Sequence, residues 1–270
     1  MVRLAIAGTS GRMGQALLEA ALATDDLQIA SALDVPRSSM IGRDAGERFG
    51  RRIGVNVGSD IDVLVRAADV LIDFTRPEGT LRHLEACAAA GVGAVVGTTG
   101  LSSEQKARLG TFAQHIPIVF APNMSVGVNV LLDLTRRAAR LLGSAFDIEI
   151  VEMHHKHKID APSGTALALG EAAAEGAGID LQQHAVYARH GVTGERKPAS
   201  IGFATLRGGD VVGEHSVIFA GAGERIELTH RAMSRQNFAA GALRAARFVA
   251  RCRAEGRRGL FDMTDVLGLR

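Results

Sequence analysis

The sequence predicts an α/β fold, in which a doubly wound parallel sheet is followed by a second, α+β domain. Up to about residue 126, short apolar runs alternate with segments of helical periodicity, which is the pattern of strands joined by crossover helices. Between residues 200 and 230, three strand-like runs instead follow one another across glycine-rich turns. The change of pattern near Val126 therefore divides the chain into two domains.

The chain opens with a predicted strand, a glycine turn and a helix. An apolar run over residues 2–7 leads into the turn, Gly8-Thr9-Ser10-Gly11-Arg12-Met13-Gly14. Glycine in such a turn lets the backbone approach a pyrophosphate that rests on the helix N-terminus. A second strand over residues 27–33 ends in Asp34, where an acid can bind ribose hydroxyls. The spacing G-x-x-G-x-x-G differs from the usual G-x-G-x-x-G, so a tight turn without a ligand remains an alternative.

Three more strand-like runs follow, at residues 70–74, 92–96 and 116–121. Helices are expected between them, and one begins with a capping box formed by Ser102 and Gln105. The carboxyl ends of parallel strands meet at one edge of a sheet, where cofactors bind. The glycine turn and the strand ends at 97–100 and 121–125 are therefore expected to line one site. Residues 35–60, rich in Gly, Arg and Ser, are expected to form a loose surface segment.

The second half of the chain begins with a long amphipathic helix after Val126, followed by an alternating strand over residues 146–150. Its later strands are expected at residues 200–206, 211–220 and 225–230. The glycine-rich segments 208–210 and 221–223 are typical of hairpin turns, which would make these strands antiparallel.

The domain boundaries follow from these elements. A last amphipathic helix begins near Phe238, and its apolar face needs a partner. We expect it to pack on the first domain, since the antiparallel sheet already has a helix. The predicted domains are therefore residues 1–126 completed by residues 235–270, and a substrate-binding and oligomerisation domain over residues 127–234.

The stretch richest in chemical groups is His154-His155-Lys156-His157-Lys158, at the end of a predicted strand. Imidazoles beside ammonium groups suit proton transfer next to an anion. A Pro-Ser-Gly-Thr turn and a helix follow, and the N–H groups of Gly164 and Thr165 can receive a carboxylate or phosphate. A proton source and an anion receptor so close together predict an acidic substrate.

Two other interpretations of this stretch stay open. A basic run is often only a solvated loop. Three close histidines can also bind a metal, but their spacing is unusual for ligands, no cysteine lies nearby, and the lysines repel a cation. We therefore expect no metal.

Composition excludes several classes of function. The net charge is only +2, and the chain has no Trp and one Tyr, which argues against nucleic-acid or membrane binding. The two cysteines, Cys87 and Cys252, have no metal or redox spacing, which favours a reduced compartment. No apolar run reaches about 18 residues, and residues 1–7 are typical of a strand rather than a signal peptide. A cytoplasmic location is expected.

With both halves in view, the sequence closely resembles the dihydrodipicolinate reductase (4-hydroxy-tetrahydrodipicolinate reductase) family, almost from end to end. The resemblance is carried by the glycine turn, Asp73-Phe74-Thr75, Gly97-Thr98-Thr99-Gly100, the segment from Ala121 to Asn129, and above all Glu152 to Lys158 with Asp160 to Ala166. It implies a Rossmann-like first domain and a homotetramer. It also implies reduction of the cyclic product of the preceding synthase, a small dicarboxylate, with NADH or NADPH in the diaminopimelate route to lysine.

The resemblance also implies roles for individual residues. His154 would be the acid/base residue and Lys158 the proton donor. His155, Gly164 and Thr165 would hold the substrate carboxylates. The cofactor would be held by Gly8, Thr9, Ser10, Gly11, Arg12, Met13, Asp34, Gly97, Thr98, Thr99, Ala121, Pro122, Asn123 and Met124, and Arg76 matches a position that can approach it.

One departure from the family bears on the cofactor. Family members often have an arginine directly after the ribose-binding acid, whereas here the order is Asp34-Val35-Pro36-Arg37. The usual contact to a 2′-phosphate is therefore weakened, and we expect both cofactors to work with NADH favoured.

Three alternative functions are compatible with parts of the sequence. A related two-domain nicotinamide dehydrogenase could act on an amino-acid semialdehyde or a similar small acid. A dinucleotide-sensing regulator would leave His154 and Lys158 without a role, and no partner-docking or DNA-binding segment is visible. A metal-dependent hydrolase would need the ligands that the histidine stretch does not provide.

Overall fold

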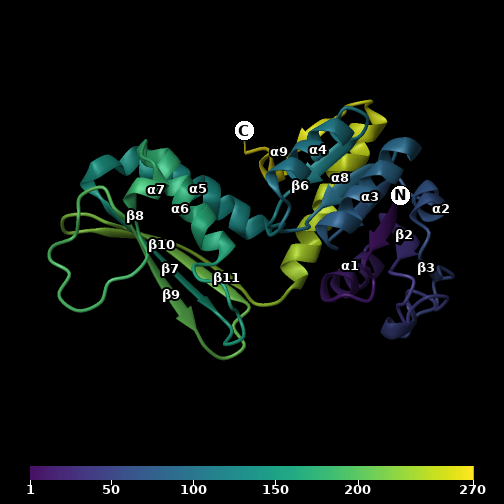
Figure 1. Cartoon of the computed structure of the whole chain (residues 1–270), viewed down its shortest axis with the longest axis horizontal. Coiled ribbons are helices and arrows are strands. Elements are labelled where there is room, and N and C mark those ends of the chain that lie inside the picture. Colours follow the sequence, from purple (N-terminus) through teal and green to yellow (C-terminus); the bar gives the residue numbers. More distant parts are fainter. Residues whose placement is uncertain (270) are drawn as a thin grey trace. The chain divides into compact units, whose positions relative to one another are not determined.

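The computed structural model describes residues 1–269 and divides the chain into two compact units (Figure 1). One unit consists of Met1–Val126 together with the chain from Arg235 onward, and the other is Gly127–Ser234. Each unit has its own sheet. The predicted fold class, a doubly wound parallel sheet with a second α+β domain, is confirmed.

The first unit contains a seven-stranded sheet with the order β12-β6-β5-β4-β1-β2-β3. Its strands are β1 (Val2–Ala7), β2 (Leu27–Leu33), β3 (Val57–Gly58), β4 (Val70–Asp73), β5 (Gly93–Val96), β6 (Pro117–Phe120) and β12 (Gly259–Phe261). Every neighbouring pair is parallel. From β1 the chain adds β2 and β3 on one side of this strand, and it then crosses to β4 on the other side of β1. The glycine turn that follows β1 therefore lies at the switch point of the sheet, where α/β proteins bind ligands.

Helices cover both faces of this sheet (Figure 1). On one face pack α1 (Arg12–Leu22), α8 (Gln236–Ala254) and α9 (Met263–Leu267); on the other pack α2 (Ile61–Leu64), α3 (Pro77–Ala90) and α4 (Ser103–Ala113). Small residues let α8 approach the sheet closely, since a Cβ at Gly93 would lie 2.3 Å from Val249 Cγ1. At the start of α4 the predicted capping box of Ser102 and Gln105 is confirmed.

The segment over residues 35–60 is more ordered than the sequence indicated. The carboxylate of Asp44 accepts the N–H groups of Gly46, Ile53 and Gly54, which folds the segment back on itself. Met40 is buried against the core of the first unit, and the segment ends in the short strand β3. One carboxylate thus organises a segment whose composition alone predicted a loose surface loop.

The second unit contains a five-stranded sheet with the order β11-β10-β7-β9-β8. Its strands are β7 (Asp147–His154), β8 (Ala185–Val186), β9 (Ile201–Arg207), β10 (Gly213–Ala220) and β11 (Arg225–Ala232). The β10–β11 pair is the expected antiparallel hairpin. The expected β9–β10 hairpin is wrong, because β7 lies between these strands and pairs parallel with β9 and antiparallel with β10. The alternating apolar residues of β7 make it the buried central strand, so it takes a partner on both sides.

One face of this sheet packs against α5 (Val126–Leu142) and α6 (Gly164–Ala177), and α7 (Leu181–His184) follows α6. The core is built from alternate strand residues such as Ile148, Ile150, Val217 and Phe219, all at most 6% exposed. This alternation places Glu152 on the same inward face of β7, next to the start of α6. In the part of the chain that the structure describes, no helix is both long and apolar enough to cross a membrane.

Candidate active site

The glycine turn of the first unit requires glycine for two separate reasons. Gly8 has φ +71°, a left-handed conformation that favours glycine. A Cβ at Gly14 would lie 2.1 Å from the Gly8 carbonyl oxygen, well inside van der Waals contact. Gly11 is the N-cap of α1, so the helix begins directly from the turn. A tight turn and a helix N-terminus are thereby placed at the carboxyl end of β1.

Asp34 fixes this turn to β2. Its carboxylate accepts the N–H of Ser10 at 2.7 Å and lies 3.4 Å from Thr9 Oγ1, while its other oxygen accepts the N–H of Val35 at 2.8 Å. The side chain is buried, whereas Arg12 and Arg37 are exposed. Asp34 therefore shapes the turn in addition to the ribose contact that the sequence predicts for it.

A pocket of about 270 Å³ lies beside the turn, within the first unit. The residues predicted for the cofactor that line it are Met13, Gly97, Thr98, Thr99, Pro122 and Met124. Phe74, Thr75 and Phe238 also line it and were missed as cofactor residues by the sequence analysis. Position 97 requires glycine because a Cβ there would lie 2.1 Å from the Phe74 ring.

Two observations on this pocket fit a bound dinucleotide. The hydroxyl oxygen of Thr75 is buried without a hydrogen-bond partner, so it can serve a ligand. Thr75 is itself held in place, because Asp73 accepts its N–H at 2.7 Å and pairs with His83 Nδ1 at 2.7 Å. A polar group fixed in this way beside a glycine turn is typical of a cofactor site.

Three other positions considered for the cofactor lie elsewhere in the first unit. Ala121 is buried and donates its N–H to Val96 within the sheet. The side chain of Asn123 accepts the N–H of Ser125, which shapes the turn after β6. Arg76 is exposed at the start of α3. None of the three is among the residues that line the pocket.

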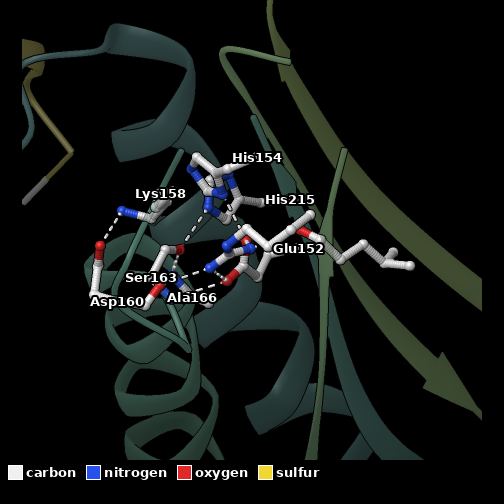
Figure 2. Close-up of polar contacts among 9 residues, drawn as sticks. Glu152, His154, Lys158, Asp160, Ser163, Ala166 and His215 are labelled. Carbon is white, nitrogen blue, oxygen red and sulfur yellow. Dashed lines mark hydrogen bonds and ion pairs between the residues drawn. The ribbon is translucent and has the colours of Figure 1, made fainter. Parts of the chain in front are cut away.

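In the second unit, the end of β7 brings a buried carboxylate to His154 (Figure 2). Glu152 is 1% exposed and accepts from His154 Nδ1 at 2.6 Å. A carboxylate can only accept, so Nδ1 of His154 carries a proton and Nε2 is left as the nitrogen that can accept one. A Cβ at Gly213 would lie 2.9 Å from this Nε2, so the glycine keeps it uncovered.

The surroundings of His154 favour a neutral imidazole. Burial, together with the positive charges of Lys158 and Arg207, outweighs the Glu152 carboxylate and holds the pKa of His154 below its usual value. Burial alone would raise the pKa of Glu152, but hydrogen bonds from Arg207, His154 and Ser163 N outweigh burial and hold it below its usual value. A neutral histidine beside an ionised carboxylate can accept a proton readily.

Lys158 lies in the loop after β7, where its Nζ contacts Asp160 at 2.8 Å (Figure 2). Its side chain is 21% exposed, so the ammonium group is accessible at the edge of the site. Asp160 is in turn held through its main-chain carbonyl, which accepts from Arg207 at 2.7 Å. The Lys158 ammonium also lies near enough to His154 to lower the pKa of its imidazole.

The predicted anion receptor corresponds to the N-terminus of α6. Ser163 is its N-cap and accepts the N–H of Ala166 at 3.2 Å, while it also hydrogen-bonds His215 Nε2 at 3.0 Å. Gly164 begins the helix and is exposed, and a Cβ there would meet nothing within 4 Å. The space beside Gly164, at the N-terminus of α6, is therefore open.

His155 follows His154 in the loop after β7 and is half-buried, and its Nδ1 is buried without a hydrogen-bond partner. An unpaired imidazole nitrogen of this kind can serve a ligand. Among residues 1–269, no group of three or more His, Cys, Asp or Glu side chains is arranged to hold a metal ion.

Three members of this cluster were not predicted from the sequence: Glu152, Arg207 and His215. Glu152 belongs to the motif that was singled out, but its role depends on its inward position on β7. Arg207 and His215 lie on β9 and β10, and each is more than 50 residues from its hydrogen-bond partner in the sequence. Burial of His215 lowers its pKa to about 4, so it stands beside His154 as a neutral ring.

Comparisons with known proteins agree over the whole chain. The family model described as "Dihydrodipicolinate reductase, N-terminus" matches residues 2–124, and the one described as "Dihydrodipicolinate reductase, C-terminus" matches residues 127–267. The chain is 57% identical to a 4-hydroxy-tetrahydrodipicolinate reductase from Thiobacillus denitrificans, covering 100% of this chain and 99% of that protein. It is 56% identical to one from Ralstonia nicotianae, covering 99% of this chain and 100% of that protein.

A solved structure supports the same grouping. Dihydrodipicolinate reductase from Paenisporosarcina sp. TG-14, described as dipicolinate bound, superposes with a TM-score of 0.77 at 26% sequence identity. The match covers 98% of each chain.

Proposed function

The chain belongs to the dihydrodipicolinate reductase family, and on that basis we propose that it reduces 4-hydroxy-tetrahydrodipicolinate with NADH or NADPH. The product is tetrahydrodipicolinate, in the diaminopimelate route to lysine. The observation that carries the assignment to specific residues is the buried Glu152–His154 pair beside Lys158 and the start of α6. It combines a proton acceptor, a proton donor and an anion receptor.

We assign the cofactor to the glycine turn and the pocket beside it. Gly8 to Met13 and Asp34 would hold the adenosine half, and the pocket at Gly97, Thr98 and Thr99 would take the rest. Ala121 to Met124 would complete the site at the end of β6. The dihydronicotinamide supplies the hydride when it is bound.

The residues of the second unit would control the proton. Loss of the 4-hydroxyl group as water turns the substrate into a conjugated imine. Hydride addition to this imine leaves electron density on the ring, and a nearby N–H⁺ must quench it by protonating a ring carbon. A lysine ammonium is charged at neutral pH, so Lys158 would donate this proton while Asp160 holds it in place. His154 would act as the acid/base partner through Nε2. His155 and the amides of Gly164 and Thr165 would bind the substrate carboxylates and so orient the ring.

A substrate panel distinguishes this function from its nearest alternative. The product of the preceding synthase should drive oxidation of NADH and NADPH, whereas amino-acid semialdehydes should not. Equal rates with a semialdehyde would favour the more general dehydrogenase instead.

Substitutions at the start of α6 test the carboxylate receptor. Gly164→Val should weaken dipicolinate binding about tenfold or more, since its side chain would fill the space above the amides and a hydrogen bond to a charged group contributes roughly 1.5–3 kcal/mol. Thr165→Ala keeps its main-chain donor and should cost less than about threefold. Calorimetric titration with dipicolinate measures both. Equal losses in the two variants would show that backbone amides do not bind the carboxylate.

Cofactor preference tests the role of Asp34. NADPH carries a phosphate where NADH presents a ribose hydroxyl, and the Asp34 carboxylate should repel it. Arg37 and Arg12 are exposed and can offset part of this repulsion. We expect both cofactors to work, with NADH favoured about tenfold in kcat/KM, near 1.4 kcal/mol. Asp34→Ala should lower kcat/KM for NADH more than for NADPH, although it also removes the acceptor of the Ser10 N–H in the glycine turn. A clear NADPH preference of the wild type in steady-state kinetics would overturn this expectation.

We propose a cytoplasmic homotetramer assembled through the sheet of the second unit. One face of the sheet packs on α5 and α6. On the other face, Leu206 is 48% exposed and Val151 and Ile218 are partly exposed. Apolar side chains on three adjacent strands would be covered by a second copy of the chain. Light scattering at micromolar concentration should give a tetramer, and a monomer mass would contradict the proposal.

A further inference from the structure

One guanidinium group, at the end of β9, contacts the supports of both proposed catalytic side chains. Arg207 donates to the two carboxylate oxygens of Glu152 at 2.8 and 2.9 Å and to the main-chain carbonyl of Asp160 at 2.7 Å. Glu152 accepts from His154 Nδ1, and Asp160 accepts from Lys158 Nζ. We propose that Arg207 and Glu152 are positioning residues that fix the tautomer of His154 and the location of Lys158. This inference rests on the catalytic roles proposed above.

The oxygens of Glu152 are both fully used, which is why the tautomer is fixed. Oε1 accepts from Ser163 N at 3.0 Å and from Arg207 Nη2, and neither donor can become an acceptor. Oε2 accepts from Arg207 Nη1 and from His154 Nδ1. Of these partners, only the His154 imidazole could have turned a lone pair toward Glu152 instead of an N–H group. Because a carboxylate oxygen can only accept, His154 Nδ1 must carry the proton and donate it to Oε2.

Arg207 stabilises the ionised carboxylate of the buried Glu152. Glu152 is 1% exposed, and an ionised carboxylate at such depth is unfavourable unless it is paired. The two-bond fork from Arg207 supplies that partner with fixed geometry. The third bond, to Asp160, ties the loop that carries Lys158 to the same guanidinium.

Glu152→Gln is the direct test of the tautomer. Oε1 faces two fixed donors and Oε2 only one, Arg207 Nη1, so the glutamine NH₂ should take the Oε2 position, lose the bond from Arg207 Nη1 and donate to His154 Nδ1. The proton of His154 then moves to Nε2. ¹⁵N NMR of histidine-labelled protein, with the signal assigned by its loss in His154→Gln, should show Nδ1–H in the wild type and Nε2–H in Glu152→Gln. A wild-type His154 protonated on Nε2 alone would overturn the inference.

The pH profile gives a second readout that a purely structural role of Glu152 would not move. The charged groups that face His154 are Glu152 on β7, Arg207 on β9 and Lys158 in the loop, while His215 on β10 is neutral. The Glu152 carboxylate raises the pKa of His154, so its removal should lower that pKa. Activity that needs neutral His154 is lost as pH falls through this pKa. The acid limb of log kcat should therefore move to lower pH by about one unit or more in Glu152→Gln.

The same variant should turn over slowly. In a serine-protease triad, the wrong histidine tautomer lowers kcat about 10⁴-fold, and we expect at least about 10²-fold here. An unshifted acid limb together with more than about a third of wild-type kcat would contradict the inference.

Arg207→Gln has a control in a second arginine that binds a glutamate of the same strand, β7. Arg189 makes an equivalent fork to Glu149, at 2.8 and 2.9 Å, on the opposite face of the sheet from Glu152. Loss of the Arg207 fork should lower kcat about 10²-fold with little change in the KM for cofactor, since misplaced catalytic groups cost about that much. Arg189→Gln should leave kcat within about threefold. Arg207→Lys, which keeps the charge without the fork, should restore only part of the rate.

The outcomes separate this inference from the proposed function. Equal effects of Arg207→Gln and Arg189→Gln would show a general effect on the sheet and overturn the positioning role. If the wild type reduced no synthase product, the proposed function would fail, whereas the NMR test of the tautomer would still stand. Arg207→Lys keeps a cation beside the buried Glu152, so it should fold even if Glu152→Gln or Arg207→Gln proves unstable.

Discussion

Replacing Lys158 by alanine should lower kcat about 10²–10⁴-fold, while the KM for cofactor changes little. The side chain is held at 2.8 Å from Asp160 and lies on the same segment as His154. Its removal takes away the proposed proton donor and a cation near the substrate carboxylates together. Among the residues assigned above to the site in the second unit, Lys158 is the one lysine, and a carboxylate holds its ammonium group. Stopped-flow or steady-state oxidation of reduced cofactor measures the loss.

Lys156→Ala is the matched control for this variant. Lys156 lies two residues earlier in the same loop and is exposed, and its backbone N–H bonds to Gly209 independently of the side chain. It carries the same charge into the same region, so a general electrostatic effect would appear in both variants. We expect Lys156→Ala to lose less than about threefold in kcat. A Lys158→Ala enzyme that kept more than about a third of wild-type kcat would exclude Lys158 as proton donor.

Gly14→Ala should lower kcat/KM for the cofactor about 10²-fold, because displacing binding groups by about 1 Å can cost that much. A Cβ at Gly14 would lie 2.1 Å from the Gly8 carbonyl oxygen, so either α1 or the glycine turn must move. Overpacking of this kind also destabilises the fold by roughly 1–3 kcal/mol. Cofactor binding followed by fluorescence titration, with thermal unfolding on the same samples, separates the two effects.

Gly110→Ala provides the contrast. Gly110 lies within α4 and a Cβ there would meet nothing within 4 Å. Alanine favours a helix over glycine by about 1 kcal/mol, so this variant should be slightly more stable and fully active. If Gly14→Ala bound cofactor as well as Gly110→Ala, the close approach at the turn would not be required for binding.

The local parts of the fold were predictable because their signals are short-range. The turn from Gly8 to Gly14 lies between an apolar run and a helical run, and the capping box of Ser102 spans only four residues. The basic stretch from His154 to Lys158 was also visible as a motif. Each of these signals depends on neighbours along the chain, which the sequence displays directly.

The non-local parts were not predictable in the same way. The parallel β7–β9 pairing joins segments separated by more than 40 residues, and glycine turns alone favoured a hairpin instead. The fork from Arg207 to Glu152 spans 55 residues. The sequence identifies Glu152 as an acid near the histidines, but only the inward face of β7 shows that it is buried and needs a cation. The hydrogen bonds that hold the proposed catalytic residues therefore depend on contacts between strands that are distant in the sequence.

The central claim is that this chain transfers hydride from a nicotinamide cofactor to 4-hydroxy-tetrahydrodipicolinate, with the proton supplied by Lys158. The most direct test is a coupled assay in which the preceding synthase generates the substrate and oxidation of NADH and NADPH is followed separately. The account predicts oxidation of either cofactor only when the synthase and both its substrates are present, with loss of that activity in Lys158→Ala. Absence of synthase-dependent oxidation by the folded wild-type protein, with both cofactors, would contradict it.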